Sequence, residues 1–150
     1  MLNRYGLINQ TVEAVETGIW ATIGLPSRGA KLHELVHQGL PFVIFTRTAA
    51  TLGLTENQLR QHLRISSSML ARRVSAGRLS TAESDQIYAL VGVLNAAIEL
   101  FEGDLCAVRQ WMKSPVPGLN SRTPLDMMAT RVETQAVMDL IGRLEQGVGG

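Results

Sequence analysis

The longest apolar pattern in the chain runs from Ser80 to Phe101 and has the spacing of a helix. Its apolar residues recur every three or four positions and form one continuous seam: Ile87, Leu90, Val91, Leu94, Ile98 and Phe101. Ser80 and Glu83 have the spacing of a capping box at the start of this pattern. The pattern therefore predicts the longest helix of the protein. We expect its seam to be either a dimerisation surface or part of an internal core.

Helical periodicity also dominates the rest of the chain. Further apolar stripes predict helices that carry Val12, Val15, Ile19 and Ile23; Leu32, Leu35 and Val36; Phe42, Phe45, Ala49 and Leu52; and Val137, Leu140, Ile141 and Leu144. Residues 42–45 alone would also fit a strand, but the longer pattern favours a helix. We therefore expect an all-α fold with a helical extension at residues 1–38, a body at residues 39–103 and a C-terminal helical module at residues 104–150.

The composition excludes several classes of protein. The chain has 150 residues, 45% of them apolar, which suffices for one domain or two small ones. Its single cysteine, Cys106, rules out an intramolecular disulfide, and we expect a buried, inert thiol. We see neither a secretory signal nor an apolar run of the roughly 20 residues that a membrane span requires, which favours a soluble cytoplasmic protein. Without a phosphate-binding loop or a nucleophile motif, we expect no cofactor and no enzymatic activity.

One window of the chain is strongly basic, although the formal net charge of the whole chain is only +1. Residues 57–82 contain no acidic residue but include Arg60, Arg64, Arg72, Arg73 and Arg78. The window overlaps two short helical patterns, at residues 54–77, that are joined by a turn at residues 64–66. Such a basic pair of helices is typical of a helix-turn-helix that binds duplex DNA. An ordinary solvated helical hairpin is the alternative.

The second helix of this pair would contact the DNA. Ser67 and Ser68 at its first turn would allow the helix N-terminus to approach a phosphate closely. Arg72 or Arg73 would bind a guanine, and Leu70 and Val74 would pack inward. Flanking phosphates would be neutralised by Arg60, Arg64 and Arg78.

An HExxH string at residues 33–37 is a second candidate site. On a helix, His33 and His37 would share one face and could bind zinc, with Glu34 as general base and Glu56 as a third ligand. The expected absence of a β-sheet beside this helix argues against a zinc hydrolase, and so few fixed positions often arise by chance. We therefore expect two surface histidines.

The segment after residue 103 has a different character. Trp111 precedes residues 114–124, which include three prolines, and Thr123, Pro124 and Asp126 then have the order that begins a helix. A large aromatic side chain beside a stiff exposed loop suits a docking surface. Packing in the core is an equally good interpretation of Trp111.

Two strings of residues together resemble a known family. The body contains Gly77-Arg78-Leu79-Ser80 followed by Glu83-Ser84, and the C-terminal module contains Trp111-Met112 followed by Pro124-Leu125-Asp126. With these strings, residues 39–147 resemble the Xre/MbcA/ParS family of type II antitoxins, in which an Xre-like helix-turn-helix precedes a toxin-binding domain. The resemblance implies a homodimer that binds a RES-domain, NAD-degrading toxin and represses its own operon at operator DNA. A stand-alone helix-turn-helix repressor without a toxin is the alternative.

The resemblance also implies which residues meet the toxin. The C-terminal domain of this family covers the active-site cleft of the toxin, and the implied contact residues are Trp111, Pro124, Leu125, Met128, Arg131, Leu140, Arg143 and Leu144. The chain departs from the family pattern at Asn120-Ser121, where paired glycines are common, and at Arg131-Val132, where Glu-Gly is usual. A glycine-rich tail follows the last helix, and we expect this tail to enter the active site of the toxin.

Overall fold

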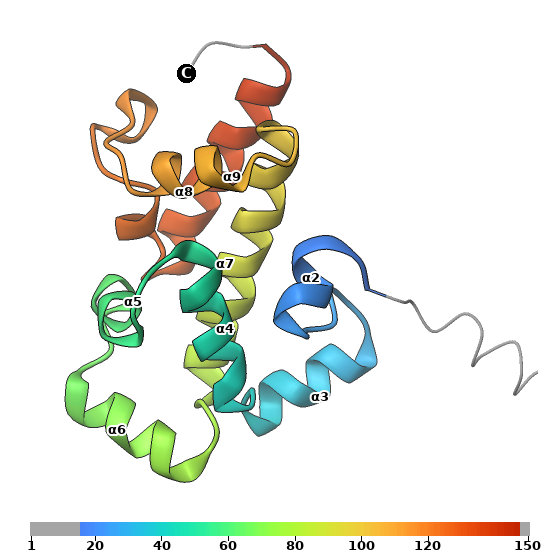
Figure 1. Cartoon of the computed structure of the whole chain (residues 1–150), viewed down its shortest axis with the longest axis vertical. Helices are drawn as coiled ribbons and strands as arrows, with labels where there is room; N and C mark the ends of the chain where they lie inside the picture. Colours follow the sequence, from blue (N-terminus) through green and yellow to red (C-terminus); the bar gives the residue numbers. More distant parts are fainter. Residues whose placement is uncertain (1–15, 148–150) are drawn as a thin grey trace, which may run out of the picture.

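The computed structural model describes residues 16–147, and it is 70% helical with no strand in this part of the chain (Figure 1). Its first helices are α2 (Gly18–Ile23), α3 (Ala30–Gln38), α4 (Phe42–Leu52) and α5 (Glu56–Leu63). They are followed by α6 (Ser67–Ala76), α7 (Thr81–Leu100), α8 (Leu105–Met112) and α9 (Arg131–Glu145). Two 3₁₀ turns, η1 (Pro117–Leu119) and η2 (Leu125–Met127), lie between α8 and α9. The prediction of an all-α fold is confirmed.

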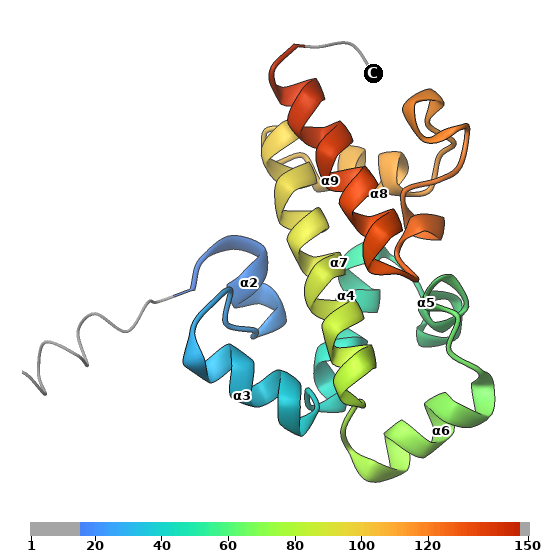
Figure 2. The same cartoon turned by 180° about the vertical axis from the view of Figure 1, so that it is seen from behind.

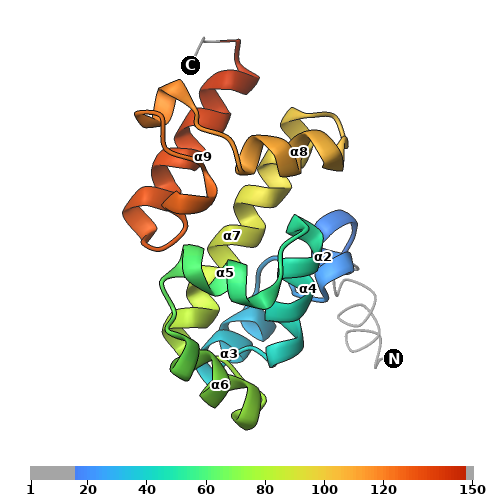
Figure 3. The ribbon, with the colours of Figure 1, turned by 60° about the vertical axis from the view of Figure 1, so that its left-hand side comes forward.

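The helix α7 is the central element of the molecule. It packs against α2, α3, α4, α8 and α9, and Figures 2 and 3 show α9 lying alongside it. Ile87, Leu90, Val91 and Leu94 are completely buried between these helices. Most of the apolar seam is therefore internal core, which settles the alternative between core and dimerisation surface for these four residues.

The chain before α4 and the chain after α6 lie antiparallel to each other. The amide of Leu79 donates a hydrogen bond to the carbonyl of Leu40 at 2.9 Å, and the Arg78 guanidinium donates one to the carbonyl of Gly39, also at 2.9 Å. Gly39 has a φ of +93°, and a Cβ built on it would lie 2.0 Å from the Leu79 carbonyl oxygen. This close approach therefore requires glycine, and it joins the N-terminal helices to the helix-turn-helix.

Two predictions of burial are wrong. Cys106 is exposed because α8 packs inward through Val108 and Met112, which lie on its other face. Val74 is 54% exposed, since α6 has no buried residue and stands away from the core. Val12 and Val15 of the first apolar stripe lie outside the described residues. None of the helices in residues 16–147 has the length and apolar content needed to cross a membrane.

Candidate functional site

The helix-turn-helix forms from local signals in the sequence. Thr55 and Gln58 make a reciprocal capping box at the start of α5, in which the side chain of each accepts a backbone N–H of the other. Arg64 ends α5 in the left-handed conformation with a φ of +60°. The side chain of Ser66 then accepts the amide of Met69 at 3.1 Å, and this cap begins α6. The predicted turn and the predicted caps are therefore present.

The helix α6 lies at one end of the molecule (Figure 1), and none of its residues is fully buried. Ser67, Ser68 and Arg72 are exposed on it, whereas Leu70 is only half-buried. A helix that is not buried in the protein is free to enter the major groove of DNA. The geometry of α6 is thus compatible with the DNA contacts expected from the sequence.

The arginines of the basic window fall into two groups. Arg73 forms an ion pair with Glu83, with 2.7 Å between Nε and Oε1, and Glu83 also accepts the amide of Ser80. Arg60 donates to the side chain of Asn57 and to the carbonyl of Ile65, and Arg78 donates to the carbonyl of Gly39 as described above. These three guanidinium groups brace the fold. Within residues 16–147, the guanidinium groups of Arg64 and Arg72 make no hydrogen bond or ion pair.

This division changes the interpretation of Arg73. A guanidinium that is held by the nearly buried carboxylate of Glu83 is less available to a base than the exposed one of Arg72. Of these two adjacent residues, Arg72 is therefore the better candidate for a contact with a guanine.

Half of the residues expected to meet a toxin are buried in this conformation. Pro124, Leu125, Met128 and Leu140 all belong to the interior, and the exposed fractions of Leu125 and Leu140 are 0%. The reason is that the proline-rich loop folds back onto α5 and α9, so its apolar side chains complete the core. Direct contact of these four side chains with a partner is therefore not supported. These four side chains instead support the surface residues by packing in the core below them.

The other expected contact residues are accessible. Trp111 is half-buried against Phe101, with 6.0 Å between the ring centroids, and both rings line a shallow hollow of about 280 Å³ together with Ala107, Gln110 and Ser114. Arg131 and Arg143 are exposed on α9, and Leu144 is half-buried near its end. Trp111 therefore serves partly as core and partly as surface.

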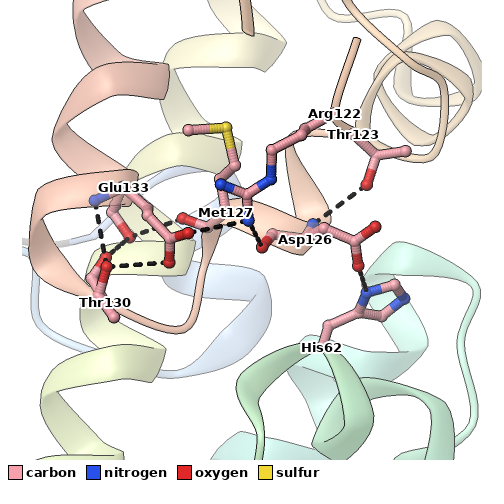
Figure 4. Close-up of polar contacts among 8 residues, drawn as sticks. His62, Arg122, Thr123, Asp126, Met127, Thr130 and Glu133 are labelled. Carbon is pink, nitrogen blue, oxygen red and sulfur yellow. Dashed lines mark hydrogen bonds and ion pairs between the residues drawn. The ribbon is translucent and has the colours of Figure 1, made fainter. Parts of the chain in front are cut away.

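A polar cluster joins the C-terminal loop to α5 (Figure 4). The Nδ1 atom of His62 lies 2.8 Å from Oδ1 of Asp126, which belongs to η2. Arg122 connects the same turn to α9, because its Nη2 atom donates to the carbonyl of Asp126 and lies 2.8 Å from Oε2 of Glu133. Farther along, the amide group of Gln86 donates to the carbonyls of Leu63 and Ala129. The loop is thus held against α5 and α9 by polar contacts.

The carboxyl groups of this cluster have lowered pKa values. Burial by itself would raise the pKa of Asp126, but hydrogen bonds from His62 and Thr123 and the positive charges of His62 and Arg122 together lower it below the ordinary value of 3.8. The pKa of Glu133 is lowered from 4.5, mainly by its hydrogen bond from Arg122. Sequence reasoning missed this cluster, because His62 and Asp126 are 64 positions apart and follow no local pattern.

The HExxH string lies on α3 as expected. His33 and His37 are both exposed, which confirms the interpretation as surface histidines. Among residues 16–147 there is no group of three or more His, Cys, Asp or Glu side chains placed to hold a metal ion.

A helix-turn-helix with an outward-facing basic helix, followed by a second helical module, defines a DNA-binding regulator with an added binding domain. Comparison with protein families gives the same two parts. The antitoxin Xre-like helix-turn-helix domain matches residues 31–92, and the antitoxin Xre/MbcA/ParS C-terminal toxin-binding domain matches residues 96–147. The border between the two matches lies inside α7, and the expected domain boundaries after residues 38 and 103 stay predictions.

Two relatives extend the comparison over most of the chain. Antitoxin Xre of Photorhabdus laumondii subsp. laumondii is 34% identical over 132 residues, which cover 87% of this chain and 89% of that protein. Antitoxin Xre of Yersinia enterocolitica serotype O:8 is 35% identical over the same share of each chain. The chain therefore belongs to the Xre/MbcA/ParS family of type II antitoxins, as its sequence strings suggest. Its members are regulatory, toxin-neutralising proteins and not enzymes.

Proposed function

We propose that the protein neutralises a RES-domain, NAD-degrading toxin by blocking the active site of this toxin. The proposal rests on the family resemblance and on the match of residues 96–147 to a toxin-binding domain. In the same proposal, the protein is a cytoplasmic homodimer that binds operator DNA and represses its own operon. The observation that carries the toxin contact is the accessible aromatic hollow at Trp111 and Phe101.

The DNA side of the proposal depends on α6. Its N-terminal amides and its dipole attract a phosphate, and the short side chains of Ser67 and Ser68 allow that phosphate to come close. Arg72 then lies on the exposed side of the same helix. A net charge of +1 provides little general attraction to DNA, so two copies of α6 on a palindromic operator would bind much better than one. Because most of the α7 seam is buried within the chain, the homodimer uses another surface.

The toxin side depends on the residues of the C-terminal module that remain accessible. Tryptophan and arginine are the residues that most often dominate the affinity of an interface. We assign direct contacts to Trp111, Arg131, Arg143 and Leu144. Pro124, Leu125, Met128 and Leu140 have a supporting role, since they hold the loop and α9 in place from the core.

Co-purification with the product of the adjacent gene tests this function. We expect a RES-domain protein to co-purify with the tagged chain, and we expect its degradation of NAD⁺ to cease in the complex. Trp111→Ala should raise the Kd of the complex by roughly 30-fold or more, which corresponds to about 2 kcal/mol for a central aromatic anchor. Lys113→Ala, an exposed neighbour beyond the hollow, is the matched control. Continued NAD⁺ degradation inside a stable complex would contradict active-site blocking, and a partner without a RES domain would contradict the toxin class.

A further inference from the structure

A cavity with a cationic rim lies between α3, the loop before it, α7 and the first turn of α9. Its volume is about 340 Å³, and the elements around it can be followed in Figure 2. The nitrogen-bearing side chains at its rim are Arg28, His33, His37 and Arg131. This cavity is separate from the exposed side of α6 and from the hollow at Trp111.

The charges at the rim favour an anion. Asp85 is the one carboxylate among the lining residues, and its Oδ1 atom is paired with the Arg131 guanidinium at 3.0 Å. The guanidinium of Arg28 makes no hydrogen bond or ion pair to residues 16–147. The nearby carboxylate of Glu16 is directed to Ser27, whose amide donates to it at 2.9 Å. The lining therefore carries a positive charge that is not neutralised within it.

The loop that carries Arg28 is fixed in place. The hydroxyl of Tyr88 on α7 donates to the carbonyl of Ser27 at 2.9 Å, so the residue before Arg28 is tied to the central helix. His33 and His37 are one helical turn apart on α3 and line the same cavity. Four side chains that can donate hydrogen bonds thus line one space from three elements, and donors of this kind suit a phosphate group.

The floor of the cavity is apolar. Leu32 and Val36 line it from α3, and the ring of Tyr88 lines it from α7. That ring is itself supported by Trp20, with 5.6 Å between the centroids. Ligand sites typically combine apolar walls with a few polar groups and have volumes of roughly 300 to 1,000 Å³, so this one matches a small ligand.

We propose that this cavity binds a phosphate monoester on a molecule of mononucleotide size. The phosphate contacts Arg28 and the two histidines, and a flat apolar group lies against Leu32, Val36 and Tyr88. The cationic rim matches the phosphate of such a ligand, and the apolar floor matches its flat group. The cavity shares Arg131 with the proposed toxin surface, but the residues that contact the phosphate, Arg28, His33 and His37, lie outside that surface.

Titration of the isotope-labelled protein by NMR tests the proposal without toxin or DNA. The probes are adenosine 5′-monophosphate, inorganic phosphate and adenosine. We expect the monophosphate to shift the amide signals of Gly29, His33 and His37. Adenosine should bind at least about tenfold more weakly, because it lacks the charged group that accepts these hydrogen bonds. Inorganic phosphate should bind more weakly than the monophosphate, since it does not use the apolar floor. Equal affinity for all three probes, or no shift at these residues, would overturn the proposal.

Substitutions separate this site from a general attraction of anions. Arg28→Ala should reduce the affinity for the monophosphate about tenfold or more, and the pair His33→Asn and His37→Asn should reduce it further. Lys31→Ala is the matched control, because Lys31 is an exposed cation on α3 that does not line the cavity. An equal loss for Lys31→Ala would overturn the proposal. So would a loss of operator affinity in Arg28→Ala, which would assign these side chains to the phosphates of DNA.

Discussion

At the scale of single residues, backbone geometry explains why glycine suits positions 120 and 121, where this chain carries asparagine and serine instead. Asn120 and Ser121 have φ values of +56° and +62°, in the left-handed region that glycine adopts most easily. Hydrogen bonds from the amide of Val116 to the carbonyl of Arg122 and from the amide of Ser121 to the carbonyl of Val116 close this loop. The loop thus keeps a backbone suited to glycine while it carries two side chains.

Ser121→Gly should therefore stabilise the protein. A left-handed conformation destabilises a residue other than glycine by roughly 1 to 2 kcal/mol, and glycine removes this strain. Glycine also increases the conformational freedom of the unfolded chain, which offsets about 0.5 to 1 kcal/mol, so we expect a net gain in stability of about 0.5 kcal/mol. Asn120→Gly should gain less, because asparagine tolerates this conformation. Urea unfolding measures both changes. A loss of stability in Ser121→Gly would contradict the explanation.

Gly39→Ala should have the opposite effect. Its φ of +93° strains any other residue, and the added Cβ would meet the carbonyl oxygen of Leu79, which is backbone and cannot turn away. We expect a loss of about 2 kcal/mol or more in the free energy of unfolding. Gly142→Ala is the control, because its added Cβ would meet no described atom within 4 Å apart from the backbone of its own helix. Helix propensity predicts a gain of about 0.5 to 1 kcal/mol for this variant. Similar results for the two variants would contradict the role of Gly39.

At the scale of helices, Arg72 and Arg73 should behave differently although they are adjacent on α6. Arg72→Ala should leave thermal stability unchanged and cost about 1 to 3 kcal/mol of discrimination between operator and unrelated DNA. Arg73→Ala should lower the stability by about 1 to 3 kcal/mol, since it leaves the nearly buried Glu83 without its ion pair. Fluorescence anisotropy and thermal unfolding measure the two effects. Equal DNA defects at unchanged stability would show that both arginines bind DNA.

The cluster that joins η2 to α5 and α9 should make stability depend on pH in the acid range. Because the pKa values of Asp126 and Glu133 are lowered by folding, the folded protein binds fewer protons at these groups than the unfolded chain. Their contribution to the free energy of unfolding is fully present at pH values above their ordinary pKa values of 3.8 and 4.5. It is lost as the pH falls through the lowered pKa values of the folded protein. Asp126→Asn should lower the Tm at pH 7 but have little effect near pH 2. The control is Asp139→Asn, because Asp139 is an exposed carboxylate on α9 that lies outside the cluster.

The helices could be predicted well because their signals are local. The caps at Thr55, Ser66 and Ser80 and the period of the apolar residues each depend on neighbours within one or two turns. Periodicity reveals the apolar face of a helix but not whether another element covers it. For this reason Val74 was expected inside and lies outside, while Leu125 was expected at an interface and lies in the core. The contact of Asp126 with His62 could not be predicted from the sequence, because the two residues are 64 positions apart and meet only in the folded chain.

At the scale of the whole molecule, α6 and the C-terminal end of α9, which carries Arg143 and Leu144 of the proposed toxin surface, lie far apart (Figure 1). Figure 1 shows α6 at one end of the long axis and the C-terminal end of α9 at the other, with α7 between them. The core is continuous from one end to the other, since the same cluster of buried side chains includes Leu59 of α5 and Val137 of α9. The proposed DNA-binding helix and the C-terminal end of the proposed toxin surface therefore belong to one continuous folded body.

Removal of residues 146–150 should separate the two activities. The helix α9 ends at Glu145, and Gln146 and Gly147 are exposed, so among the described residues the deletion removes none from the helix or from the buried core. If the tail enters the active site of the toxin, the truncated protein should still co-purify with the toxin through Trp111 but should no longer stop NAD⁺ degradation. Its affinity for operator DNA should stay within about twofold of the full chain, because distant sites contribute independently. Full neutralisation by the truncated protein would show that the folded surface alone covers the active site.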